Sequence, residues 1–158
     1  HMTNERIQEF TRRITQANRS GLTLIKFEIL FAYFDDICKA FEKHDREGIS
    51  KAVHLADEVL KSFQETLDFS YEISPRLYAL YDFHRRQLSK VLIRDSLDDL
   101  QQSRKMLQKT YEAFAEAAKQ DTSAPLMRNA QQVYAGYTYG RNDINESYDV
   151  QSSRGFLA

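Results

Sequence analysis

The scarcity of helix-breaking residues is the feature that most constrains the fold of this chain. Between Leu22 and Gln120 only Gly48 and Pro75 can interrupt a helix, and Leu, Ala, Glu, Lys, Gln and Arg dominate the same stretch. These residue types have high helix propensity. At 158 residues the chain has the usual size of one domain and can bury a core. The sequence therefore predicts an all-α domain.

In the first half of the chain, apolar residues recur at spacings of three and four, which predicts three helices. A short helix is expected over residues 4–17. Ser20 is expected to cap a long second helix that runs to Phe41. The charged stretch 42–48 predicts a turn, and a third helix then reaches Leu67.

Two start signals mark the remaining helices. Ser74 and Pro75 are expected to cap and begin a fourth helix, because a serine oxygen accepts from free amides and proline gives up an N–H without a partner. Asp95-Ser96 predicts the start of a fifth helix that ends near Lys119. Because the connections between the four long helices are short, neighbours must be antiparallel. The expected fold is an antiparallel up-down bundle of four long helices plus a short N-terminal helix.

The second helix carries more apolar surface than one face needs. Beside the stripe that includes Phe27, Leu30 and Phe34, it has further apolar residues such as Leu24 and Ile29. A helix that is apolar on two faces either lies at the centre of a bundle or touches a partner. The central position is the commoner arrangement, and the partner surface stays open.

The composition changes at Gln120, where we expect an irregular C-terminal extension. Residues 121–158 hold Pro125 and three of the five glycines, without a sustained helical period. Aromatic residues such as Tyr134 and Phe156 are unusual in a solvated tail, so the extension is expected to dock on its own bundle or a neighbour's, or to be ordered by crystal packing alone. The predicted organisation is an N-terminal segment 1–18, a bundle domain 19–120 and an extension 121–158.

No pattern in the sequence predicts catalysis, a metal site or a cofactor. The histidines are isolated, and no Glu-x-x-His pair of a di-iron bundle occurs. The acidic pairs, at residues 35–36 and 98–99, diverge by about 100° on a helix and cannot share a substrate proton. Cys38 is the only cysteine, and neither a phosphate-binding loop nor a dinucleotide fingerprint is present. We therefore expect no enzymatic activity.

Charge and hydropathy bear on partners and location. The net charge of −1 with both signs interspersed gives no basic surface for nucleic acid. No apolar run approaches the roughly 20 residues of a membrane span, and the N-terminus lacks a signal-peptide pattern. The leading His-Met is typical of a cloning remnant, so the native sequence is expected to begin near Met2. We expect a cytoplasmic protein that neither binds nucleic acid nor inserts into a membrane.

The segment LDFSYEISPRLYALYDFHRRQLSKVLIRD, residues 67–95, resembles the flagellin export chaperones of the FliS family. The residues that match the family's Leu-Tyr-x-Leu-Tyr-Asp-Tyr/Phe core are Leu77, Tyr78, Leu80, Tyr81, Asp82 and Phe83. The resemblance covers about residues 14–114. Departures include Ser20-Gly21 where the family commonly has Ser-Pro, Lys26 within an apolar run, Phe27 in place of tyrosine, and Tyr111 in place of a terminal tryptophan.

The resemblance implies a cytosolic chaperone that binds the disordered C-terminal segment of flagellin, blocks premature polymerisation and delivers flagellin to the type III export gate. Flagellin's ends are amphipathic helices, so before export their apolar faces need a helix-in-groove partner. The alternatives are an adaptor for another amphipathic peptide and, behind it, a bundle enzyme with an unrecognised site.

Apolar residues left over after the core is filled are candidates for the groove that binds flagellin. They are Ile25, Ile29 and Tyr33 on the second helix and Leu77, Tyr78 and Tyr81 on the fourth. For each of them a core position is the commoner arrangement, and the groove position stays open. The N-terminal stripe of Ile7, Phe10 and Ile14 is expected to form a mobile lid over this groove, or else to extend the core. The docked extension would then be self-inhibitory, because a tethered segment has a high effective concentration.

Overall fold

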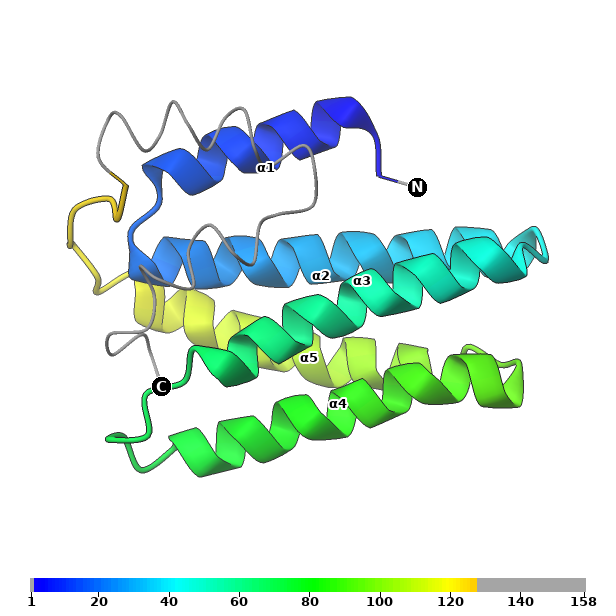
Figure 1. Cartoon of the computed structure of the whole chain (residues 1–158). Helices are drawn as coiled ribbons and strands as arrows, with labels where there is room; N and C mark the ends of the chain where they lie inside the picture. Colours follow the sequence, from blue (N-terminus) through cyan, green and yellow to red (C-terminus); the bar gives the residue numbers. More distant parts are fainter. Residues whose placement is uncertain (1, 128–158) are drawn as a thin grey trace.

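Five α-helices account for most of the computed structural model, which describes residues 2–127 (Figure 1). They are α1 (Asn4–Gln16), α2 (Arg19–Glu42), α3 (Arg46–Glu65), α4 (Ser74–Arg94) and α5 (Asp98–Ala118). The described part of the chain contains no strand. The predicted all-α fold with one short and four long helices is confirmed.

The four long helices form a bundle in which each contacts two others. α2 and α4 each pack against both α3 and α5, and successive helices run in opposite directions (Figure 1). α1 lies outside this bundle and packs against α2. The predicted central position of α2 is confirmed, because α2 contacts α1, α3 and α5.

The helix caps differ from the predicted ones at α2, α4 and α5; α5 begins at Asp98, and its N-cap residue is Leu97, which makes no side-chain cap. Asn18, and not Ser20, caps α2, and its Oδ1 accepts from the Gly21 amide at 2.9 Å. At α4 the N-cap residue is Ile73, which makes no side-chain cap. The Ser74 hydroxyl instead donates to the Asp68 carbonyl in the preceding loop. At α2 and α4, therefore, the nearby serine binds another segment of the chain.

The connection between α2 and α3 is shorter than the predicted turn over residues 42–48. α3 begins at Arg46 because the Asp45 side chain accepts from the Gly48 amide at 2.9 Å. A Cβ atom on Gly48 would lie 2.3 Å from Asp45 Oδ2. The glycine therefore permits this close cap, and it lies in the first turn of a helix where the sequence pattern suggested an interruption.

Aromatic side chains connect all four long helices in the core. The centroid of the Phe27 ring of α2 lies 4.7 Å from that of Phe63 on α3. It lies 6.0 and 5.7 Å from the ring centroids of Tyr111 and Phe114 on α5. Tyr81 of α4 stacks on Phe63 with a centroid distance of 5.0 Å. Aromatic pairs of this kind stabilise the folded protein beyond the hydrophobic burial of their surface area. The packing of α2, α3, α4 and α5 is therefore interdependent.

One buried polar pair joins α4 to α5. His84 and Ser103 are both 0% exposed, and His84 Nδ1 lies 2.8 Å from Ser103 Oγ. Among the described residues, Nε2 of His84 has no hydrogen-bond partner. Burial lowers the pKa of His84 to about 4, because the protein interior disfavours the charged imidazolium.

We expect acid to destabilise the bundle through His84. Unfolded His84 binds a proton below about pH 6.5, whereas the folded side chain does so only below about pH 4. The unfolded state therefore binds more protons in this window, and the free energy of unfolding should fall by up to about 1.4 kcal/mol for each unit of pH lowered. Urea unfolding at several pH values should show that this component is lost in His84→Gln.

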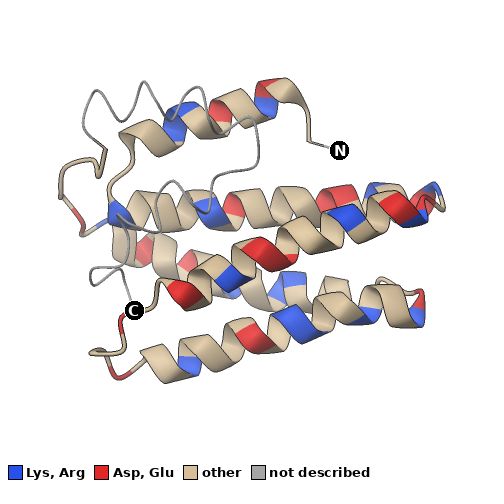
Figure 2. Cartoon of the chain, viewed as in Figure 1, with Lys and Arg blue, Asp and Glu red and all other residues tan. Residues whose placement is uncertain are grey.

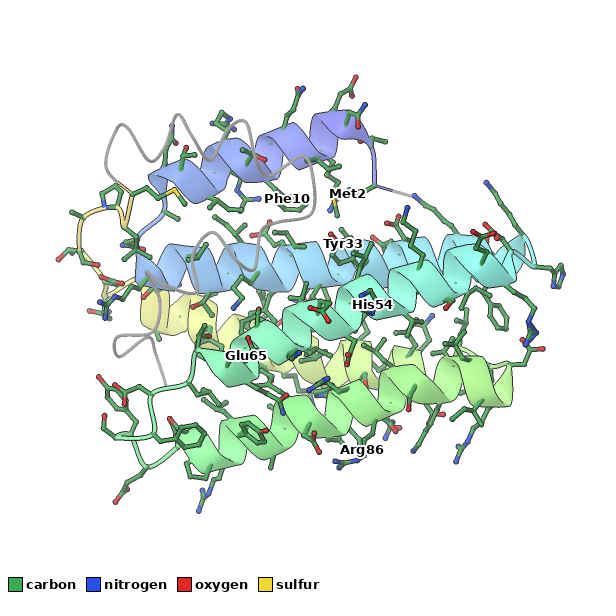
Figure 3. All side chains as sticks on the ribbon, viewed as in Figure 1. Met2, Phe10, Tyr33, His54, Glu65 and Arg86 are labelled. Carbon is green, nitrogen blue, oxygen red and sulfur yellow. The ribbon has the colours of Figure 1, made fainter. Side chains whose placement is uncertain are left out.

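The matched control for this measurement is His54→Gln, because His54 is exposed on α3 (Figure 3). This variant should keep the full pH dependence of the original chain. An identical pH dependence in His84→Gln and His54→Gln would contradict the assignment to His84.

Candidate functional site

One face of α2 lies opposite Phe27 and Phe34, is apolar and buried, and belongs to the same hydrophobic cluster as those two residues. At 100° per residue, Ile25, Ile29 and Tyr33 lie on the side of α2 opposite Phe27 and Phe34. Their exposed fractions are only 4%, 2% and 8%. We call these three residues the outer face of α2. The sequence placed them in the binding groove, and the structure brings them together on one helix face.

α1 packs on the outer face of α2 through its own apolar stripe. Phe10 and Ile14 of α1 are buried, and Ile7 is half-buried. Figure 3 shows Phe10 on the side of α1 that faces α2, and Tyr33 on the side of α2 that faces α1. α1 is therefore an amphipathic helix whose apolar side contacts the bundle and whose opposite side faces solvent.

One ion pair fixes the position of α1 on α2. The Arg13 guanidinium donates two hydrogen bonds to the Glu28 carboxylate, at 2.8 and 2.7 Å. The hydrogen bond to Glu28 raises the pKa of Arg13. The pKa of Tyr111 is also raised, mainly by burial and secondly by the negative charge of Glu28. The guanidinium carbons of Arg6 and Arg13 also lie 5.4 and 5.9 Å from the Phe10 ring centroid. Because Arg13 and Glu28 are about one-third exposed, we expect the pair to orient α1 more than to stabilise it.

An open groove continues the outer face of α2 beyond the start of α1. Its volume is about 500 Å³, and it lies between the C-terminal half of α2 and the N-terminal half of α3. Tyr33 and Leu55 supply apolar walls, and Met2 and Ile7 close the end nearest α1. The charged residues around it are Lys39, Lys43, Lys51, Asp36 and Asp45. The groove thus has an apolar wall and a rim that carries both signs of charge.

The three predicted site residues of α4 lie in two other places. Leu77 and Tyr81 are buried and belong to the hydrophobic core, and burial raises the pKa of Tyr81. Tyr78 is 45% exposed, and its ring lies 6.1 Å from that of Phe69 in the loop before α4. The structure therefore does not bring the α4 residues together with the outer face of α2.

Sequence reasoning missed the charged and loop residues near these surfaces. The ion pair between Arg13 and Glu28 joins two helices, and no local spacing signals such a pair. The exposed Phe69, Tyr71 and Ile73 precede α4 in a segment without helical period. The run of aromatic and apolar residues between two helices was the only sequence signal for them.

A comparison with models of known protein families shows to which family this chain belongs. The model of the family described as flagellar protein FliS matches residues 2–121. The chain belongs to the FliS family. The resemblance of residues 67–95 to this family is thereby confirmed, and with it the role of a flagellar export chaperone. A search of curated proteins gave no match.

The described part of the FliS chain contains neither a metal-binding cluster nor a membrane-spanning helix. Within residues 2–127, no group of three or more His, Cys, Asp and Glu side chains could hold a metal ion. In the same range no helix is both long and apolar enough to cross a membrane. Both signs of charge occur on α1, α2, α3 and α4 (Figure 2).

We predict that charge reversal at the Arg13–Glu28 pair will loosen α1, and that the double reversal will restore it. Arg13→Glu places two carboxylates together, and Glu28→Arg places two guanidinium groups together. Each single change should accelerate amide exchange in α1, while the double variant should recover about 0.5–1 kcal/mol of coupling. Hydrogen exchange at low and high salt measures this. A double variant that exchanges as fast as the single variants would contradict the role of the pair.

Proposed function

We propose that this FliS protein binds the C-terminal amphipathic segment of flagellin on the outer face of α2, in the place that α1 occupies in the free protein. The bound segment is held in the cytosol, is prevented from polymerising and is delivered to the flagellar type III export apparatus. Ile25, Ile29 and Tyr33 form the floor of this site. Residues 1–18, with Ile7, Phe10 and Ile14, act as the lid.

The observation that carries the proposal is the contact between α1 and α2. The chain's own amphipathic helix lies on an apolar face of the bundle, with Phe10 and Ile14 buried. Another amphipathic helix with apolar residues at the same spacing fits the same surface. Flagellin's C-terminal segment has this character, because its apolar face is buried only in the filament. Membership of the FliS family supports flagellin as the partner.

The attachment of α1 also suits a displaceable lid. α1 packs mainly against α2, whereas α2, α3, α4 and α5 share the aromatic core around Phe27 and Phe63. Release of α1 therefore leaves that core intact. An incoming helix must compete with a tethered one, so the apparent affinity for flagellin is reduced by the fraction of molecules in which α1 is closed.

The open groove beside Tyr33 is a starting point for this exchange. It lies next to Met2 and Ile7 at the beginning of α1. A flagellin helix that enters there meets apolar walls from Tyr33 and Leu55 before α1 has moved. Displacement of α1 then proceeds from its first turn towards Ile14.

Substitutions on the two sides of the α1–α2 contact should change flagellin affinity in opposite directions. Phe10→Ala weakens the lid and should tighten binding of a flagellin C-terminal peptide by about tenfold. Ile29→Ala removes floor contacts from both the lid and the peptide, so in the Phe10→Ala background, where the lid is already weakened, it should weaken binding by about tenfold. Calorimetric titration, with circular dichroism to detect helix formation in the peptide, measures both.

Tyr78→Ser is the control in this experiment, because Tyr78 is exposed on α4 away from the outer face of α2. It should leave the affinity unchanged. Weaker binding in Tyr78→Ser, with unchanged binding when Ile29→Ala is added to Phe10→Ala, would move the site to the α4 surface and contradict the proposal. Equal binding of an unrelated amphipathic peptide would favour a general adaptor.

A further inference from the structure

The segment that follows α5 returns to the connection between α1 and α2. Residues 119–127 run from the end of α5 to this connection, as the yellow and gold part of the chain in Figure 1. We call residues 121–127 the latch. The connection itself is short, because α1 ends at Gln16 and α2 begins at Arg19. Any swing of α1 must therefore turn about Ala17 and Asn18.

The latch holds both residues of this hinge. The Leu126 amide donates to the Ala17 carbonyl at 3.0 Å. The side-chain amide of Asn18 donates to the carbonyls of Asp121 and Ser123, at 3.4 and 3.2 Å. Hydrogen bonds from two separate hinge residues to one segment restrict the backbone rotation that α1 needs in order to leave α2.

The first turn of α2 is bound to the latch as well. The Ser20 hydroxyl donates to Asp121 Oδ2 at 2.6 Å, and the Ser20 amide points to the same oxygen at 3.4 Å. The other oxygen of Asp121 accepts from the amide of Ser123 at 2.9 Å. These hydrogen bonds from the Ser123 and Ser20 groups lower the pKa of Asp121, so the carboxylate stays charged beside the N-terminus of α2.

The far end of the latch is anchored by apolar contact. Met127 is only 8% exposed and belongs to the hydrophobic core, and Leu126 packs against it. Ala17 and Ile14 of the α1 end belong to the same cluster or pack on it. The latch thus combines polar contacts at the hinge with apolar anchoring beside it.

We propose that residues 121–127 are a latch that sets how often α1 leaves the outer face of α2. The step from α1 movement to flagellin affinity rests on the function proposed above, but the latch itself does not. When the latch is bound, Ala17, Asn18 and Ser20 are fixed and α1 stays closed. When it is released, the hinge no longer restrains α1, and α1 leaves the outer face of α2 more often.

Two substitutions in the full chain remove latch contacts without removing the α2 cap. Asn18→Asp keeps the side-chain oxygen that accepts from Gly21, but replaces the donor that contacts Asp121 and Ser123 by a negative charge. Ser20→Ala removes the hydroxyl that donates to Asp121. Ser89→Ala is the matched control, since Ser89 is exposed and its hydroxyl donates, within residues 2–127, to the Arg86 carbonyl one turn away on α4.

The primary measurement is hydrogen exchange of the α1 amides, with the amides of α3 and α4 as an internal reference. Loss of one hydrogen bond should speed α1 exchange roughly fivefold, and the combined Asn18→Asp and Ser20→Ala variant should exceed either change alone. Ser89→Ala should leave α1 exchange unchanged. Unchanged α1 exchange in the combined variant would overturn the latch, as would an equal acceleration in all helices.

Titration of the same variants with the flagellin C-terminal peptide separates the latch from the proposed function. Faster α1 exchange together with tighter binding supports both. Faster α1 exchange with unchanged binding supports the latch and rejects α1 as the cover of the flagellin site.

Discussion

The second helix has two apolar faces that must both be kept from water, and the remaining structure is arranged around this requirement. One face, with Phe27 and Phe34, packs into the core that α3, α4 and α5 complete. A four-helix bundle has no element left for the other face. α1 covers it, which explains why a 13-residue helix that would be marginal by itself in water is retained outside the bundle. The position of α1 and the candidate site therefore both follow from the second apolar face of α2.

The helices and their number could be predicted because both depend on local sequence. Few helix breakers and a sustained apolar period are enough to place long helices to within a few residues. The caps were less predictable, since Ser20 and Ser74 have the residue type of a cap but bond other segments. The start of α3 was misread because Gly48, expected as a breaker, lies in the first turn and accommodates the Asp45 cap.

The candidate site was predictable only in part. The spacing of Ile25, Ile29 and Tyr33 indicates a shared helix face, and the structure places them together. The Leu-Tyr core around Leu77 and Tyr81 is the part of the sequence that most resembles the family, yet these side chains stack and pack inside the bundle. A family motif can thus mark the core that holds the helices together. Tertiary contacts such as Arg13 with Glu28, or Asn18 with Ser123, join residues whose separation in sequence carries no signal. Of the extension expected over residues 121–158, residues 121–127 contact the connection between α1 and α2, whereas residues 128–158 lie outside the described residues.

The order of α1 and α2 along the chain has a consequence for biosynthesis. A ribosome produces the chain from its N-terminus, so α1 is complete before the apolar outer face of α2 emerges. The connection of two residues between them lets α1 fold back as soon as α2 forms. The residues that complete α3, α4 and α5 arrive later and bury the other face. The nascent chain therefore carries a cover for the apolar outer face of α2 from the start, which reduces the apolar surface exposed to aggregation during synthesis.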